Sequence, residues 1–159
     1  MPQIAVIGSG TCAQDSDLAQ LAEEVGRHLA EAGGVLVCGG LGGVMEAAAR
    51  GAAAAGGTVI GIVPSESPAD ANPHCTHVVA TGIGHARNLA VVASGAAVVA
   101  VGGEWGTLAE IGFARRLDRA VVSLRSWRPS GEGEMAEMPG VAVAESAEEA
   151  VERALAEAG

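Results

Sequence analysis

With 159 residues, the chain is long enough for one domain with a substantial core, and 49% of the residues are hydrophobic although only 2% are aromatic. Nineteen acidic residues outnumber nine basic ones, all arginine, for a formal net charge of −10. Such an acidic protein is unsuited to general nucleic-acid binding, although a local arginine patch that grips an RNA stays open as an alternative. The lack of lysine excludes a P-loop lysine and a Schiff base to pyridoxal phosphate.

The three cysteines, Cys12, Cys38 and Cys75, are odd in number and widely spaced. This pattern favours reduced thiols in a cytosolic protein over a disulfide framework. His74 and His77 flank Cys75 and could be read as metal ligands, but the sequence offers no matching pair elsewhere. We therefore predict a polar loop here and no metal site.

No targeting or membrane segment is expected. The first residues, Met1-Pro2-Gln3, lack a basic export-signal region. The longest apolar run, residues 89–101, is too short to span a bilayer and is interrupted by Ser94-Gly95. The sequence thus predicts a cytoplasmic protein that does not enter a membrane.

Apolar strand-like segments alternate with amphipathic segments along the whole chain. Strands are expected at residues 4–7, 35–38, 58–63, 78–80, 97–101, 120–124 and 141–143. Helices are expected from about Ser16 to the glycines at 33–34, and at residues 44–55, 85–93, 107–117 and 147–156, with Asp15 or Ser16 capping the first. The alternation predicts one Rossmann-like α/β domain over residues 1–159, a doubly wound, mostly parallel sheet with helices on both faces.

Two loops interrupt this alternation. Residues 64–74 are rich in Pro, Ser and Asp and could act as a flap, and residues 125–139 form a polar stretch before the last strand.

Glycine-rich turns follow three of the expected strands. They are Gly8-Ser9-Gly10, Gly39-Gly40-Leu41-Gly42-Gly43 and Gly102-Gly103-Glu104-Trp105-Gly106. Such turns let backbone N–H groups approach an anion, and the positive end of the following helix adds to the attraction. In a doubly wound sheet all three lie at the carboxyl edge, where ligands bind. The pattern predicts a pocket for a phosphorylated small molecule.

Arg87 begins the fourth expected helix, and its guanidinium fork matches phosphate geometry. The alternative is an arginine that is solvated or paired with a surface carboxylate. Asn88 could hold a loop or a ligand amide. Arg115, Arg116 and Arg119 lie near a helix C-terminus, where the dipole favours cations, and we interpret them as structural.

Two glutamates follow the glycine turns. Thr107-Leu108-Ala109-Glu110 has the form of a capping box, yet Glu110 could instead meet a ribose hydroxyl or activate water at the mouth of the pocket. Glu46 has the same ambiguity, and position alone favours caps for both. Trp105 could equally stack on a base or pterin ring or fill a dimer contact.

The segment Gly102–Glu110 resembles the PGGxGTxxE signature of the LOG family, the cytokinin-activating phosphoribohydrolases often labelled lysine decarboxylases. Gly39–Met45 is similar to that family's GGGxxGLM-type turn, and His85–Asn88 lines up with its MHxRK segment. The resemblance spans roughly residues 4–124 and implies a Rossmann-like fold. The decarboxylase label does not fit, because no lysine is present to hold the cofactor.

The chain departs from this signature at two positions. Val101 replaces the signature proline and Asn88 replaces the lysine, which is more similar to the molybdenum-cofactor-carrier branch of the superfamily. That branch binds a phosphorylated pterin cofactor. In the hydrolases the arginine and the signature glutamate are the catalytic pair, and by resemblance these are Arg87 and Glu110.

These observations together predict a binding or carrier protein for a phosphorylated, nucleotide-like ligand, with no required cofactor; molybdenum cofactor or a nucleoside monophosphate would be the ligand. By family resemblance the protein is expected to be a homodimer or larger homo-oligomer. The predicted phosphate and ligand site comprises Gly8, Ser9, Gly39, Gly40, Gly42, Gly43, Met45, Arg87, Asn88, Gly102, Gly103, Glu104, Trp105, Gly106 and Thr107.

Two other functions stay open. One is a nucleoside 5′-monophosphate phosphoribohydrolase that cleaves the base–ribose bond. Glu110 would then orient or deprotonate water and Arg87 would hold the substrate or assist the leaving group. The other is a ligand-sensing or assembly module without turnover.

Overall fold

The structure, a computed structural model, describes residues 1–127 and 140–159. Seven described strands form one sheet in the order β4-β3-β2-β1-β5-β6-β7, and every neighbouring pair is parallel. The strands are β1 (Gln3–Gly8), β2 (Val35–Cys38), β3 (Val59–Val63), β4 (His77–Ala80), β5 (Ala97–Val101), β6 (Ala120–Leu124) and β7 (Val141–Val143). This confirms the predicted Rossmann-like fold, and most of the polar stretch predicted at 125–139 lies outside the described residues.

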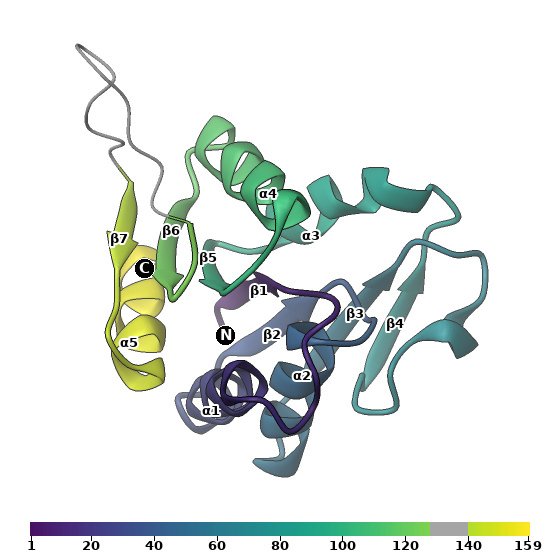
Figure 1. Ribbon diagram of the computed structural model, residues 1–159, viewed down its shortest axis with the longest axis horizontal. Helices are drawn as coiled ribbons and strands as arrows, with labels where there is room; N and C mark the ends of the chain where they lie inside the picture. Colours follow the sequence, from purple (N-terminus) through teal and green to yellow (C-terminus); the bar gives the residue numbers. More distant parts are fainter. Residues whose placement is uncertain (128–139) are drawn as a thin grey trace.

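The described residues form five α-helices, of which the first four lie between strands and the last follows β7: α1 (Asp17–Glu31), α2 (Val44–Ala54), α3 (Arg87–Ser94), α4 (Trp105–Arg116) and α5 (Ala147–Glu157). Two 3₁₀ turns, η1 (Pro68–Asp70) and η2 (Gly84–Ala86), lie in the connections on either side of β4. Helices α1, α2 and α5 cover one face of the sheet, and α3 and α4 cover the other (Figure 1). Side chains therefore alternate between two cores along each strand.

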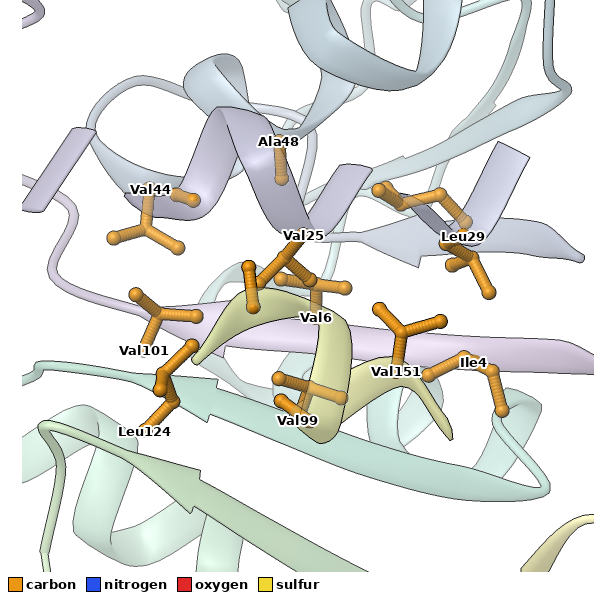
Figure 2. Packing of buried hydrophobic residues seen from close by; sticks show 14 of the residues in the cluster. Ile4, Val6, Val25, Leu29, Val44, Ala48, Val99, Val101, Leu124 and Val151 are labelled. Atoms are coloured by element: carbon orange, nitrogen blue, oxygen red, sulfur yellow. The ribbon is translucent and has the colours of Figure 1, made fainter. Parts of the chain in front are cut away.

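The strands in the middle of the sheet are buried on both faces. Along β1, Ile4 and Val6 pack into the core under α1, α2 and α5, while Ala5 and Ile7 pack into the core under α3 and α4. Figure 2 shows the first of these cores, which includes Val99 of β5 and Val151 of α5. This two-sided burial explains why these strands read as nearly continuous apolar runs.

Small residues let α1 and α2 approach closely. A Cβ added at Gly26 of α1 would lie 1.9 Å from Ala48 O, and one added at Gly51 of α2 would lie 2.0 Å from Glu23 O. Because the two backbones nearly touch, larger residues cannot be accommodated at either position. The surplus of Ala and Gly in the composition follows from this packing.

Of the two predicted caps for α1, the structure selects Ser16, whose Oγ accepts from Ala19 N at 3.2 Å. The start predicted for α4 at Thr107 was wrong, because this helix begins at Trp105 with Glu104 as its N-cap. Gly102 and Gly103 have φ of +55° and +123°, and they turn the chain so that the helix begins directly after Glu104.

The structure therefore corrects the predicted capping roles of Glu110 and Glu46. Thr107 lies inside the first turn of α4 rather than at its cap, so Glu110 cannot close a capping box with it. Helix α2 starts after Gly43, and no side chain makes a capping hydrogen bond at this described helix end. The pKa of Arg50 is raised mainly by its hydrogen bond to Glu23. The negative charge of Glu46 nearby makes a smaller contribution to this rise.

Candidate functional site

A pocket of about 140 Å³ opens at the carboxyl ends of β1, β2 and β5. The strand order reverses between β1 and β5, and this is the switch point where open α/β sheets bind ligands. The pocket is lined by Val6, Ile7, Gly8, Gly10, Gly39, Met45, Arg87, Asn88, Glu104, Gly106, Thr107 and Glu110. Of these twelve, Val6 and Ile7 were missed by sequence reasoning, and Gly10 was named only as part of the Gly8-Ser9-Gly10 turn.

Arg87 begins α3 and is 7% exposed, so its guanidinium is buried beside the first glycine turn. Its Nη2 donates to Gly39 O at 3.1 Å and its Nη1 donates to Asn88 Oδ1, whereas the buried Nε has no hydrogen-bond partner among the described residues. A Cβ at residue 39 would lie 2.8 Å from Arg87 Nη2, which explains the glycine. Burial lowers the pKa of Arg87, but an arginine keeps its charge in proteins.

Glu110 lies one turn into α4 and is 8% exposed. Burial raises its pKa to about 7, and the charge of Arg87 opposes this rise. No ion pair within 4.0 Å joins these two described residues, so they act on each other through charge at longer range. The pocket thus holds a fixed cation and a carboxyl group that changes protonation near neutral pH.

Glu104, the N-cap of α4, links the second glycine turn to the loop after β1. Its Oε1 accepts from Thr11 Oγ1 at 2.6 Å and from Ser9 Oγ at 3.3 Å. The Ser9 hydroxyl, predicted to meet the ligand, is therefore turned toward this carboxylate, and Ser9 is not among the lining residues.

The first turn of α4 supplies backbone N–H groups to the pocket. Leu108 N makes the first intrahelical hydrogen bond, to Glu104 O at 3.1 Å, so the N–H groups of Trp105, Gly106 and Thr107 precede the intrahelical ladder. Gly106 and Thr107 line the pocket. Together with the helix dipole, these donors favour an anion.

The first glycine turn is fixed mainly by other parts of the protein. Asn72 donates from its backbone N to Gly40 O at 2.8 Å and from Nδ2 to Leu41 O at 3.0 Å. Gln14 Nε2 donates to Gly43 O at 3.1 Å. Gly40, Gly42 and Gly43, all predicted site residues, shape this turn but do not line the pocket.

In the second turn, Gly102 and Gly103 likewise shape the backbone without lining the pocket. Trp105 is 77% exposed, and its ring centroid lies 5.4 Å from that of Trp127 at an interplanar angle of 32°. Trp127 Nε1 donates to Glu104 O at 3.0 Å, which ties the pair to the cap of α4. Sequence reasoning missed Trp127. Its place just after an expected strand, in a chain with so few aromatic residues, could have marked it as a candidate site residue.

The other candidates lie away from the pocket. Arg115 Nη1 donates to Arg119 O at 2.6 Å near the end of α4, which fits the structural role predicted for this cluster. Across residues 1–127 and 140–159, no three metal-binding side chains gather. In the same ranges, no helix has the length and apolar character needed to cross a bilayer.

Comparison with known proteins gives this arrangement a context. An uncharacterized protein from Archaeoglobus fulgidus is 45% identical over 123 residues, covering 77% of this chain and 80% of that protein. The molybdenum cofactor binding protein from Rippkaea orientalis matches with 32% identity and a TM-score of 0.84, covering 98% of this chain and 96% of the other. The molybdenum cofactor carrier protein from Chlamydomonas reinhardtii matches with 30% identity and a TM-score of 0.85, over 99% and 98% of the two chains.

More distant structures share the fold alone. DNA processing protein A from Streptococcus pneumoniae is 20% identical with a TM-score of 0.70, and this chain covers 60% of it. The family model described as the SLOG cluster4 family, by contrast, matches residues 1–151 of this chain. The chain therefore belongs to the SLOG cluster4 family, within the LOG-like superfamily that its glycine turns resembled.

Proposed function

We propose that this protein binds or carries a phosphorylated, nucleotide-like small molecule, with the phosphate between Arg87 and the first turn of α4. The observation that carries the proposal is Arg87 Nε, a buried donor of a charged group without a hydrogen-bond partner. Leaving such a donor unsatisfied costs about 1–3 kcal/mol, more for a charged group, and a small shift of the Arg87 side chain toward the pocket would let a phosphate oxygen satisfy it. The N–H groups of Gly106 and Thr107, in the same pocket, supply further donors.

For the ligand we propose molybdenum cofactor, a phosphorylated pterin, carried as cargo. Support comes from the carrier and binding proteins of this cofactor, which match over nearly the whole chain at 30–32% identity. The residues present fit such a molecule: Arg87, Gly106 and Thr107 would hold its phosphate, and the exposed ring of Trp105, which packs against the partly buried Trp127, would offer an aromatic surface to its rings. The metal chemistry belongs to the cargo, and the protein contributes recognition.

A phosphoribohydrolase is the second candidate, and Glu110 is the observation that favours it. A carboxyl group with a pKa of about 7 is well placed to accept and donate protons at neutral pH. Glu110 would orient or deprotonate the attacking water, and Arg87 would hold the phosphate of a nucleoside 5′-monophosphate. Both candidates use the same anion site.

We also propose a homodimer, supported by apolar side chains left exposed on α3 and α4. Leu89, Phe113 and Leu117 are 44%, 39% and 38% exposed. Helices α3 and α4 lie next to each other on one face of the sheet (Figure 1), so these residues belong to one side of the protein. Light scattering of the purified protein should give twice the mass of one chain, and a monomer at micromolar concentration would contradict the proposal.

One experiment distinguishes the carrier function from the hydrolase function. The protein is incubated with AMP or a cytokinin monophosphate while free base is followed, and binding of molybdopterin is measured by calorimetry in parallel. Base release that disappears in Glu110→Gln would establish the hydrolase. Tight pterin-phosphate binding without base release would establish the carrier, and neither binding nor release would overturn both.

A further inference from the structure

Two of the three cysteines, Cys38 and Cys75, meet next to the first glycine turn. Cys38 ends β2, and its register partner on β3 is Gly61. A Cβ at Gly61 would lie 2.6 Å from Cys75 Sγ and 3.3 Å from Cys75 Cβ, so Cys75 fills the place where a side chain of residue 61 would lie. Register partners on neighbouring strands are about 4.8 Å apart and direct their side chains to the same face. Cys75 therefore lies directly beside Cys38, in the same core.

The two thiols are chemically unequal. Cys38 is fully buried, whereas Cys75 is half-buried and borders solvent. The interaction of the two side chains lowers the pKa of Cys75 and, with burial, raises the pKa of Cys38, while the Cys75 thiol itself donates to Asn72 Oδ1 at 3.6 Å. The more accessible sulfur is thus the better nucleophile, and the buried one is placed to react with it afterwards.

We infer that Cys38 and Cys75 form a reversible oxidation site that takes a peroxide as oxidant and closes to a disulfide. The Cys75 thiolate attacks one peroxide oxygen, so that an S–O bond forms, the O–O bond breaks and the leaving hydroxide takes a proton to become water. Cys38 sulfur then attacks the sulfenic sulfur, the S–S bond forms, the S–O bond breaks and the second water leaves. Two thiols lose two electrons and two protons, and hydrogen peroxide is reduced to two waters.

The position of this bond connects it to the ligand site. Cys75 lies three residues after Asn72, whose backbone N–H donates to Gly40 O and whose side chain donates to Leu41 O. Cys38 precedes Gly39, whose carbonyl accepts from Arg87. Oxidation therefore adds a covalent bond to the hydrogen bonds by which Asn72 attaches the loop before β4 to the first glycine turn. This inference is independent of which ligand the pocket binds.

The test uses the Cys12→Ser protein, in which Cys38 and Cys75 are the remaining thiols. After treatment with hydrogen peroxide and alkylation with iodoacetamide in denaturant, the intact mass should show the loss of two hydrogens and no alkylation, and dithiothreitol should restore two alkylated thiols. The oxidised protein should melt about 5–10 °C higher, because the bridge constrains the unfolded chain. Adding Cys75→Ser should abolish both effects.

Three outcomes would overturn the inference: two alkylated thiols after peroxide, oxygen added to Cys75 without a bridge, or a disulfide between two chains. Peptide mapping of the oxidised wild-type protein guards against a misfolded variant, because it should recover the Cys38 and Cys75 peptides as one linked species. Linkage of Cys12 in their place would equally contradict the inference.

Discussion

The two glycine turns share one sequence design but contribute different parts of the site. The turn after β2 has its carbonyls bound by Asn72, Gln14 and Arg87, so the protein itself uses these acceptors. The turn after β5 leads into α4, whose first N–H groups precede the intrahelical ladder, and Gly106 and Thr107 of this helix start line the pocket. The first turn positions the cation, and the second supplies the backbone donors.

The difference teaches that a glycine-rich turn is not by itself a phosphate-binding loop. In the first turn, glycine is needed for close approach of chain segments, since a Cβ at Gly43 would lie 2.2 Å from Ser9 O. In the second, glycines with positive φ let the helix begin at the pocket. Both turns need glycine for space and for positive φ, since Gly40 has a φ of +74° and a Cβ at Gly103 would lie 2.4 Å from Thr107 Oγ1; the difference is that the second turn leads into a helix start that lines the pocket.

The largest effect is expected from breaking the first turn. Gly43→Ala should lower the free energy of unfolding by about 4 kcal/mol, because the new Cβ meets backbone and the φ of +64° is strained for alanine. Gly56→Ala is the matched control: its φ is +75°, but nothing lies within 4 Å, so only about 1 kcal/mol should be lost. Urea denaturation measures both, and equal losses would refute close approach as the cause.

A pH effect of nearly the same size is expected from Glu110. Because its pKa rises from 4.5 to about 7 on folding, the native state binds more protons, and stability should fall as pH rises from about 4.5 to 7. Glu110→Gln should remove roughly 3 kcal/mol of this pH dependence. Unfolding curves at pH 4.5 and pH 8 test it. If both proteins respond to pH identically, the carboxyl group is not buried as described.

Removing the cation should weaken ligand binding. Arg87→Met should reduce the affinity for a phosphorylated ligand about 10- to 100-fold, since a hydrogen bond to a charged group contributes about 1.5–3 kcal/mol. Arg153→Met is the control, because Arg153 pairs with Glu149 on α5, away from the pocket. Calorimetry with AMP or a pterin phosphate provides the measurement. Unchanged affinity in Arg87→Met, or an equal loss in both variants, would contradict the assigned role.

The smallest expected effect is on anion affinity, and it tests how Glu104 in the second turn contributes to the site. Glu104→Gln removes a negative charge at the pocket and should tighten anion binding about two- to fivefold at low salt, with the gain shrinking as salt is added. Weaker binding in this variant would show that the link from Glu104 to Thr11 positions the site and matters more than its charge.

Most of the fold was predictable from the sequence, because valine-rich strands, amphipathic helices and glycine stops leave clear periodic signals. The start of α4 was not, because Glu104 is not a typical cap and its conformation depends on the two glycines before it. Of the site, Arg87 and Glu110 were found through a motif. The burial that raises the pKa of Glu110 depends on tertiary packing, which a motif does not report.

The contacts that the sequence analysis failed to predict are mainly those between segments far apart in the chain. Trp127 meets Trp105 only because β5 and β6 are neighbours in the sheet. Cys38 and Cys75 looked widely spaced in sequence, and the register of β2 against β3 brings them together. Such pairs are fixed by strand order and register, neither of which can be obtained from local sequence patterns.

A crystal structure of the protein grown with AMP tests the central claim most directly. We predict the phosphate within hydrogen-bonding distance of Arg87 Nε and of the N–H groups of Gly106 and Thr107. A phosphate bound elsewhere, with Arg87 Nε still unpaired, would contradict the account.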